Sequence, residues 1–214
     1  MKKLLLIIFY FFIFNSVSNA LIEVDITRGN LDPLPIAVSP LYVEPGSKEI
    51  KQNNKIIKNI GEEISKVIEV NFRRSGLFNP LKKDSFVQNP DIAHAKPRFE
   101  DWRLIKAQAL VTGKVSITDD KLRAEFRLWD VVAAKEMVAL AFSTTPENWR
   151  RVAHIISDKI YQRLTGEEGY FDTRIIYVSE TGKKTQRIKK LAIMDQDGAN
   201  VKYLTLGNEL VLTP

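Results

Sequence analysis

Two long segments with helical periodicity, each apolar on one side only, constrain this sequence more than any other feature. Residues 54–76 carry an apolar stripe at three- and four-residue spacing, formed by Ile56, Ile57, Ile60, Ile64, Val67, Ile68 and Phe72. Residues 145–166 carry a second stripe, formed by Trp149, Val152, Ala153, Ile156, Ile160 and Leu164. Gly76 and Gly166 are suited to end the two helices, because glycine readily adopts the left-handed C-terminal conformation. One-sided helices of this kind must cover an apolar layer.

Three strands between the two helices supply that layer. Residues 109–118, 121–132 and 135–144 have strand patterns separated by short turns, which predicts an antiparallel meander. A short apolar strand at 36–41 precedes the first helix, and a short helix is expected at 99–108. The middle strand alternates, with one face formed by Leu122, Ala124, Phe126, Leu128 and Asp130. We therefore predict an α/β domain over residues 35–168, in which helices cover a mixed sheet.

The pattern changes after Gly169, where only short strands and polar turns follow. The 42 residues from Thr173 to Pro214 approach the roughly 40–45 residues of one propeller blade. We predict that residues 169–214 are the start of an incomplete β-propeller. A lone blade cannot bury both faces of its sheet, so this part should pack poorly by itself.

The first 20 residues read as a secretory signal peptide. Lys2 and Lys3 precede an apolar run at 4–14, and the small residues Ser18 and Ala20 fit a cleavage site between Ala20 and Leu21. The apolar run is too short for a hydrocarbon core of roughly 30 Å, so a spanning anchor is not expected. Cysteine is absent, which excludes disulfides and a lipid-bearing cysteine.

The basic composition does not indicate nucleic-acid binding. Without the signal segment, thirty basic residues face 26 acidic ones, a net charge of +4. Charges alternate in sign along the chain and form no basic face with interleaved aromatics.

The sequence offers little for catalysis or for a metal. His94 and His154 are the only histidines, and neither has a second histidine at ligand spacing. The acidic turn DQDGAN, residues 195–200, lacks the spacing of a calcium loop, so a tight turn is the better interpretation. No nucleophile or nucleotide-binding motif is found. We expect a non-enzymatic protein without a cofactor or metal.

Four segments, in order, resemble the family of the Tol-Pal system protein TolB from Gram-negative envelopes. They are PIAVSPL, NFRRSGLFNPL, LTGEEGYFDTRIIYVSE and LAIMDQDGANVKYLTLGNELVLTP. The resemblance implies a periplasmic, non-catalytic protein with an N-terminal α/β domain and a six-bladed propeller. The family supports outer-membrane integrity and invagination during cell division by linking TolA to the lipoprotein Pal, and other envelope proteins are further expected partners. Because the family continues past Pro214, we expect this chain to be a fragment.

The same resemblance implies roles for the N-terminal arm, residues 21–34. Its first part would bind TolA, through Leu21, Ile22, Glu23, Val24, Asp25 and Ile26. Alternating apolar and acidic residues suit an extended segment that adds a strand to a partner's sheet, or to the sheet of its own domain. Pal would bind the propeller, which is mostly missing from these 214 residues.

Two other functions remain open at this point. One is an exported propeller-containing hydrolase with its catalytic domain beyond Pro214. The other is a free-standing periplasmic ligand-binding protein, which would need a defined pocket in the α/β domain.

Overall fold

A six-stranded mixed sheet forms the centre of the α/β part. The computed structural model describes residues 32–52 and 55–207. The sheet has the order β5-β1-β6-β7-β8, and the short strand β2 (Tyr42–Val43) also pairs with β6. Its strands are β1 (Leu34–Val38), β5 (Phe78–Pro80), β6 (Ala109–Ile117), β7 (Leu122–Asp130) and β8 (Lys135–Thr144). β1 runs parallel to β5 and β6, whereas β6, β7 and β8 form the predicted antiparallel meander.

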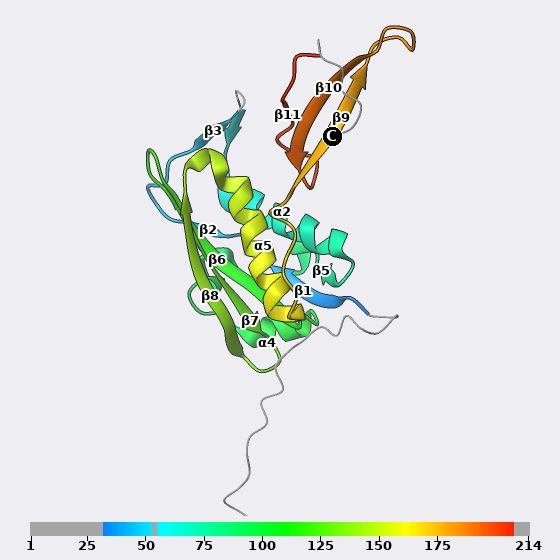
Figure 1. The fold of residues 1–214 in the computed structure, drawn as a ribbon. Coiled ribbons are helices and arrows are strands. Elements are labelled where there is room, and N and C mark those ends of the chain that lie inside the picture. The colour runs from blue at the N-terminus through cyan, green and yellow to red at the C-terminus, as the bar shows by residue number, and fades with distance from the viewer. Residues whose placement is uncertain (1–31, 53–54, 208–214) are drawn as a thin grey trace, which may run out of the picture.

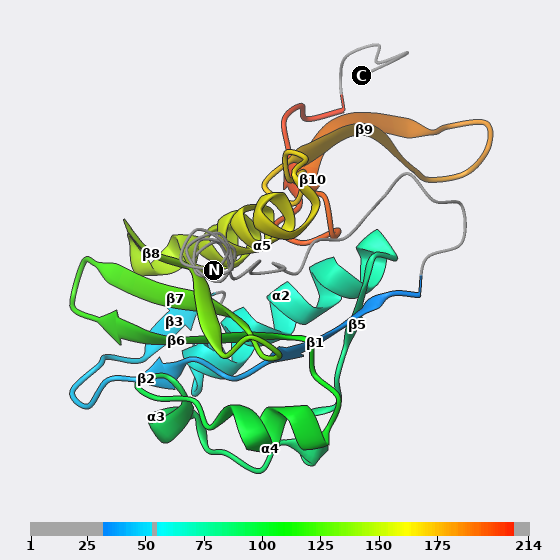
Figure 2. The same ribbon diagram turned by 90° about the horizontal axis from the view of Figure 1, so that it is seen from below.

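Helices cover both faces of this sheet, which confirms the predicted α/β class (Figures 1 and 2). The long helices α2 (Ile60–Ser75) and α5 (Trp149–Thr165) lie on one face. The short helices α3 (Pro90–Ala93) and α4 (Phe99–Leu104) lie on the other. The larger core lies under α2 and α5, and a smaller one surrounds the buried Trp102 of α4. Short 3-10 turns occur at Lys83–Ser85 and Pro146–Asn148.

The first long helix is shorter than its apolar spacing predicts. Helix α2 begins at Ile60, because the side-chain oxygen of Asn59 accepts a hydrogen bond from the Glu62 amide and caps the helix. Ile56 and Ile57 instead belong to β4 (Lys55–Ile57), which pairs with β3 (Ile50–Gln52). Placing these two isoleucines in the helix was therefore wrong. The helix expected at 99–108 likewise ends early, at Leu104.

Strand β8 contains a bulge. Leu128 pairs with Val138, and Trp129 pairs with Glu136, so Met137 has no partner on β7. The carbonyl oxygen of Met137 instead accepts a hydrogen bond from Arg163 of α5 at 3.4 Å. The bulge thus ties the start of the edge strand to the helix above it.

The chain that leaves α5 stays attached to the α/β part. Gly166 ends the helix with a φ of 79°. The carboxylate of Asp158 then accepts hydrogen bonds from the Phe171 and Asp172 amides, at 2.7 and 3.0 Å. Phe171 is buried in the larger core. The α/β core therefore includes a residue beyond position 168, where we expected the domain to end.

A second, three-stranded sheet follows. It consists of β9 (Arg174–Thr181), β10 (Ile188–Asp195) and β11 (Lys202–Tyr203), all antiparallel. The neighbours Ile175 and Ile176 are 41% and 49% exposed, and successive strand residues point to opposite faces, so apolar side chains remain uncovered on both faces. Figure 1 shows this sheet standing apart from the first and approaching it near α2 and α5. The expected last strand, ELVLTP, lies outside the described residues.

Candidate functional site

The predicted partner-binding residues fall outside the part of the chain that the structure describes. This holds for Ala20 and for the arm residues Leu21 to Ile26. Of the two histidines, His94 stacks on Tyr42 with 4.5 Å between ring centroids and lies at the end of α3. His154 lies in a buried polar contact between the second sheet and the long helices.

That contact is made by the turn after β10, which the sequence predicted as a tight turn. The Gly198 amide donates to the Asp195 carbonyl at 2.9 Å, and the Asp195 amide donates to the Ala199 carbonyl at 2.9 Å. Gly198 has a φ of +86°, which glycine accepts without strain. The prediction of a tight turn is confirmed. We call residues 195–198 the docking turn.

The docking turn contacts both long helices. The carboxylate of Asp197 accepts a hydrogen bond from Arg150 on α5, and its side chain is only 3% exposed. The side-chain amide of Gln196 donates to the Asn71 side-chain oxygen at 3.0 Å, and its carbonyl accepts from Arg74 at 2.9 Å. The turn is therefore fixed to α2 and α5 through side chains and backbone alike.

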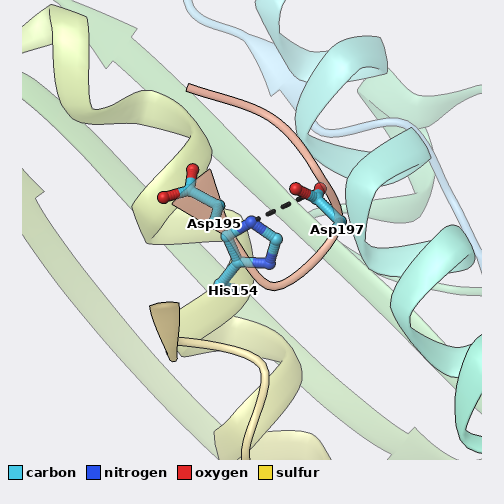
Figure 3. Close-up of side chains that lie close together, drawn as sticks. All are labelled: His154, Asp195 and Asp197. Carbon is cyan, nitrogen blue, oxygen red and sulfur yellow. Dashed lines mark ion pairs between the residues drawn. The ribbon is translucent and has the colours of Figure 1, made fainter. Parts of the chain in front are cut away.

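His154 lies beneath the turn and completes the network. Asn71 donates to Ser157 at 2.9 Å, and its amide nitrogen lies 3.0 Å from His154 Nδ1. Because the Asn71 oxygen already accepts from Gln196, its NH₂ group faces the imidazole. Nδ1 is then the acceptor, and the proton of the neutral ring sits on Nε2. Figure 3 shows the ring directed at Asp197, whose oxygen lies 3.6 Å from Nε2.

The pKa values of this pair follow from burial and charge. Burial lowers the pKa of His154, and the positive charge of Arg150 adds to this against the opposing effect of Asp197. Burial would raise the pKa of Asp197, but hydrogen bonds from the Ala199 amide and Arg150, and the Arg150 charge, hold it below its ordinary value. Above the lowered pKa of His154, the pair is thus a neutral imidazole beside a carboxylate.

A metal ion does not fit this cluster, although ligand atoms of His154, Asp195 and Asp197 lie within 4.8 Å of one another. The Arg150 guanidinium already neutralises Asp197 and would repel a cation. Nε2 also carries the ring proton in the hydrogen-bonded arrangement, so it has no free lone pair for a metal. The arrangement instead holds a β-turn on two helices.

Sequence reasoning placed the turn correctly but missed its partners. Arg150, His154 and Ser157 follow each other at spacings of four and three residues on α5. His154 and Ser157 are polar residues within the buried side of this amphipathic helix, and that was the available signal. The partners on α2 and the docking turn are far away in sequence and gave no local indication.

Comparison with known proteins assigns the family. The family model of the TolB amino-terminal domain matches residues 22–137, more than half of the chain. The chain belongs to the TolB family. A Tol-Pal system protein TolB from Pelagibacter ubique (strain HTCC1062) is 73% identical over 197 residues, which cover 91% of this chain and 44% of that protein. The chain thus spans less than half the length of that TolB.

The fold of the TolB from Acinetobacter baumannii is similar as well. Its crystal structure superimposes with a TM-score of 0.65 at 23% identity, and the match covers 86% of this chain and 41% of that one. This likeness concerns the fold. TolB family members are generally non-catalytic. In the described residues, no helix has the length and apolar character needed to cross a bilayer.

Proposed function

We propose that this chain is the N-terminal part of a non-catalytic, periplasmic component of the Tol-Pal envelope system. The observation that carries the proposal is the 73% identity to a Tol-Pal system protein TolB over most of the chain. The signal peptide would direct export to the periplasm and would be removed by cleavage between Ala20 and Leu21. The mature protein would link TolA to Pal for outer-membrane integrity and invagination during division. The same identity favours this function over the alternative of an exported hydrolase.

The proposed TolA contact is the arm, expected at residues 21–34, although Leu34 already belongs to β1 of the domain's own sheet. Ile22, Val24 and Ile26 alternate with Glu23 and Asp25, so an extended arm presents an apolar face and an acidic face. Such a segment can add a strand to the edge of a partner's sheet, with backbone hydrogen bonds giving affinity and the alternate side chains giving specificity.

A pull-down of the TolA C-terminal domain by the chain beginning at Leu21 tests the arm. We expect binding, and we expect its loss when residues 21–25 are deleted. The matched control replaces Lys183 and Lys184 by alanine, because these exposed residues lie in the β9–β10 turn and should not matter. Binding that survives the deletion would refute the arm's role.

We further propose that β9, β10 and β11 begin the propeller that would bind Pal. The support is the second sheet itself, which leaves apolar side chains uncovered on both faces, as a blade awaiting its neighbours would. In this proposal the α/β domain and the propeller are two domains, and the docking turn forms the non-covalent contact between them.

A pull-down of Pal by a full-length version of this protein tests that part. Capture of Pal by the full-length protein, and not by residues 21–214, supports the proposal. Equal capture by both would place the Pal contact in the α/β part and contradict it.

A further inference from the structure

Strand β8 forms the open edge of the α/β sheet. It pairs with β7 on one side, and none of the described residues pairs with it on the other. Figures 1 and 2 show it at the border of the sheet, beside α5. An edge strand of 10 residues leaves a row of backbone N–H and C=O groups available for another strand. This availability is independent of the proposed function.

The inner face of this edge is apolar. Val138, Leu140 and Phe142 pair with Leu128, Phe126 and Ala124 of β7, which belong to the larger core. Leu140 is nevertheless 41% exposed, because the sheet ends there. Val138 and Leu140 form one wall of a groove of about 420 Å³ beneath α5.

The other wall of the groove is cationic. Lys159 and Arg163 line it from α5 together with Gln162 and Gly166. Lys159 contacts Gln162, and Arg163 contacts the Met137 carbonyl, while no carboxylate pairs with either charge among the described residues. A strand added to β8 would therefore place one face of its side chains against apolar residues and next to two unneutralised positive charges.

The outer face of the edge presents no steric obstacle. Ala139, Ala141 and Ser143 occupy it, opposite Arg127, Glu125 and Arg123 of β7. These small side chains let a neighbouring backbone approach to the usual interstrand distance of about 4.8 Å.

We propose that β8 is a docking edge for an extended segment of a partner protein that directs aspartate or glutamate side chains toward α5. Charge complementarity with Lys159 and Arg163 selects this occupant. A second copy of the chain fits less well. Antiparallel pairing of two β8 strands about Leu140 would keep both α5 helices on the same face and bring Lys159 and Arg163 toward their own copies.

An acidic β-strand peptide tests the proposal on the chain beginning at Leu21. The probe is a fluorescein-labelled octapeptide of alternating valine and glutamate, and the control peptide alternates valine and lysine. We expect the acidic probe to raise fluorescence anisotropy and to slow amide hydrogen exchange within residues 135–144. Absence of binding, equal binding of the lysine peptide, or protection confined to β9 or β11 would overturn the proposal.

Two variants place the binding on this edge. The double variant Lys159→Glu and Arg163→Glu should weaken binding of the acidic probe by about tenfold or more. Leu140→Glu puts a negative charge on the exposed apolar position, which repels the acidic probe, and should weaken binding similarly. Lys184→Glu, at an exposed turn of the other sheet, should leave it unchanged. Affinities equal in all four proteins would overturn the proposal.

Two further measurements separate this occupant from the alternatives. A dimer in sedimentation velocity that Leu140→Glu dissolves would show that a second copy occupies the edge, and would refute a foreign partner. Amide hydrogen exchange within residues 135–144 is also measured without peptide, before and after deletion of residues 21–31. Faster exchange after the deletion would show that the chain's own arm occupies the β8 edge, which would also refute a foreign partner.

Discussion

The side-chain amide of Gln196 donates to the side-chain oxygen of Asn71 at 3.0 Å, joining two residues 125 positions apart in the chain. The bond also fixes which way the Asn71 amide faces, and through it the proton on His154. One contact from the second sheet therefore sets the hydrogen-bonding state of a buried histidine in the first domain.

Replacing Asp197 by asparagine should loosen the docking turn. The substitution keeps the size of the side chain but removes the charge opposite Arg150, and hydrogen bonds to charged groups contribute roughly 1.5–3 kcal/mol. We expect the amides of Gly198 and Ala199 to exchange with solvent about tenfold faster or more. Asp91→Asn, at an exposed position of α3, is the control. Unchanged exchange in Asp197→Asn would show that the pair does not hold the turn.

The buried histidine should make folding stability fall in mild acid. The pKa of His154 is lowered from 6.5, so the unfolded chain takes up this proton at a higher pH than the folded chain does. The stability that depends on neutral His154 is thus complete above pH 6.5. It decreases as the pH falls from 6.5 toward the lowered pKa, by at most about 1.4 kcal/mol per pH unit.

Urea unfolding between about pH 5 and 8, compared with His154→Gln, measures this effect. The difference between the two proteins cancels the contributions of titrating groups that do not interact with His154. We expect the unfolding free energy of the original chain to decrease in acid relative to the variant. Parallel pH profiles would mean that His154 titrates normally.

Phe171 should be as important to stability as a residue in the centre of the domain. It is 1% exposed and contacts Phe72 and Tyr161, with ring centroids 6.4 and 5.8 Å away. Phe171→Ala should lower the free energy of unfolding by about 3–5 kcal/mol. Its neighbour Tyr170 is 45% exposed, and Tyr170→Ala should cost much less. Equal losses in the two variants would show that the segment after α5 is not part of the core.

The cluster around His154 should not take up zinc. Calorimetric titration of the chain with Zn²⁺ is expected to give no heat that depends on His154. A signal that His154→Gln abolishes would contradict the orientation deduced for Asn71. It would also show that the charge of Arg150 does not exclude a cation.

Local signals in the sequence predicted the elements whose structure depends on local interactions. Gly166 ended α5 where expected, and the alternation of Leu122, Ala124 and Phe126 placed β7 with its apolar face toward the helices. The same reasoning failed at Ile56 and Ile57. Their spacing matched the helix, but the cap at Asn59 and the pairing with β3 decided the structure.

The polar contact could not be predicted because its members converge only in the folded chain. Asn71 is separated from His154 by 83 positions, and Asp197 lies 47 positions after Arg150. The sequence presents Asp197 as an ordinary turn residue, and solvent exposure is the usual state of an aspartate in a turn. Its burial depends on where β10 ends relative to α5, which is a property of the three-dimensional arrangement.

The hydrogen bonds that the Phe171 and Asp172 amides donate to Asp158 have a mechanical consequence. The connection between the helix and the second sheet cannot serve as a long flexible hinge, because its backbone is bonded to α5 up to Asp172. Bending is then confined to the step from Asp172 into β9, which begins at Arg174. A pull on the second sheet is therefore transmitted to α5 at Asp158, in addition to the contacts that the docking turn makes with α2 and α5.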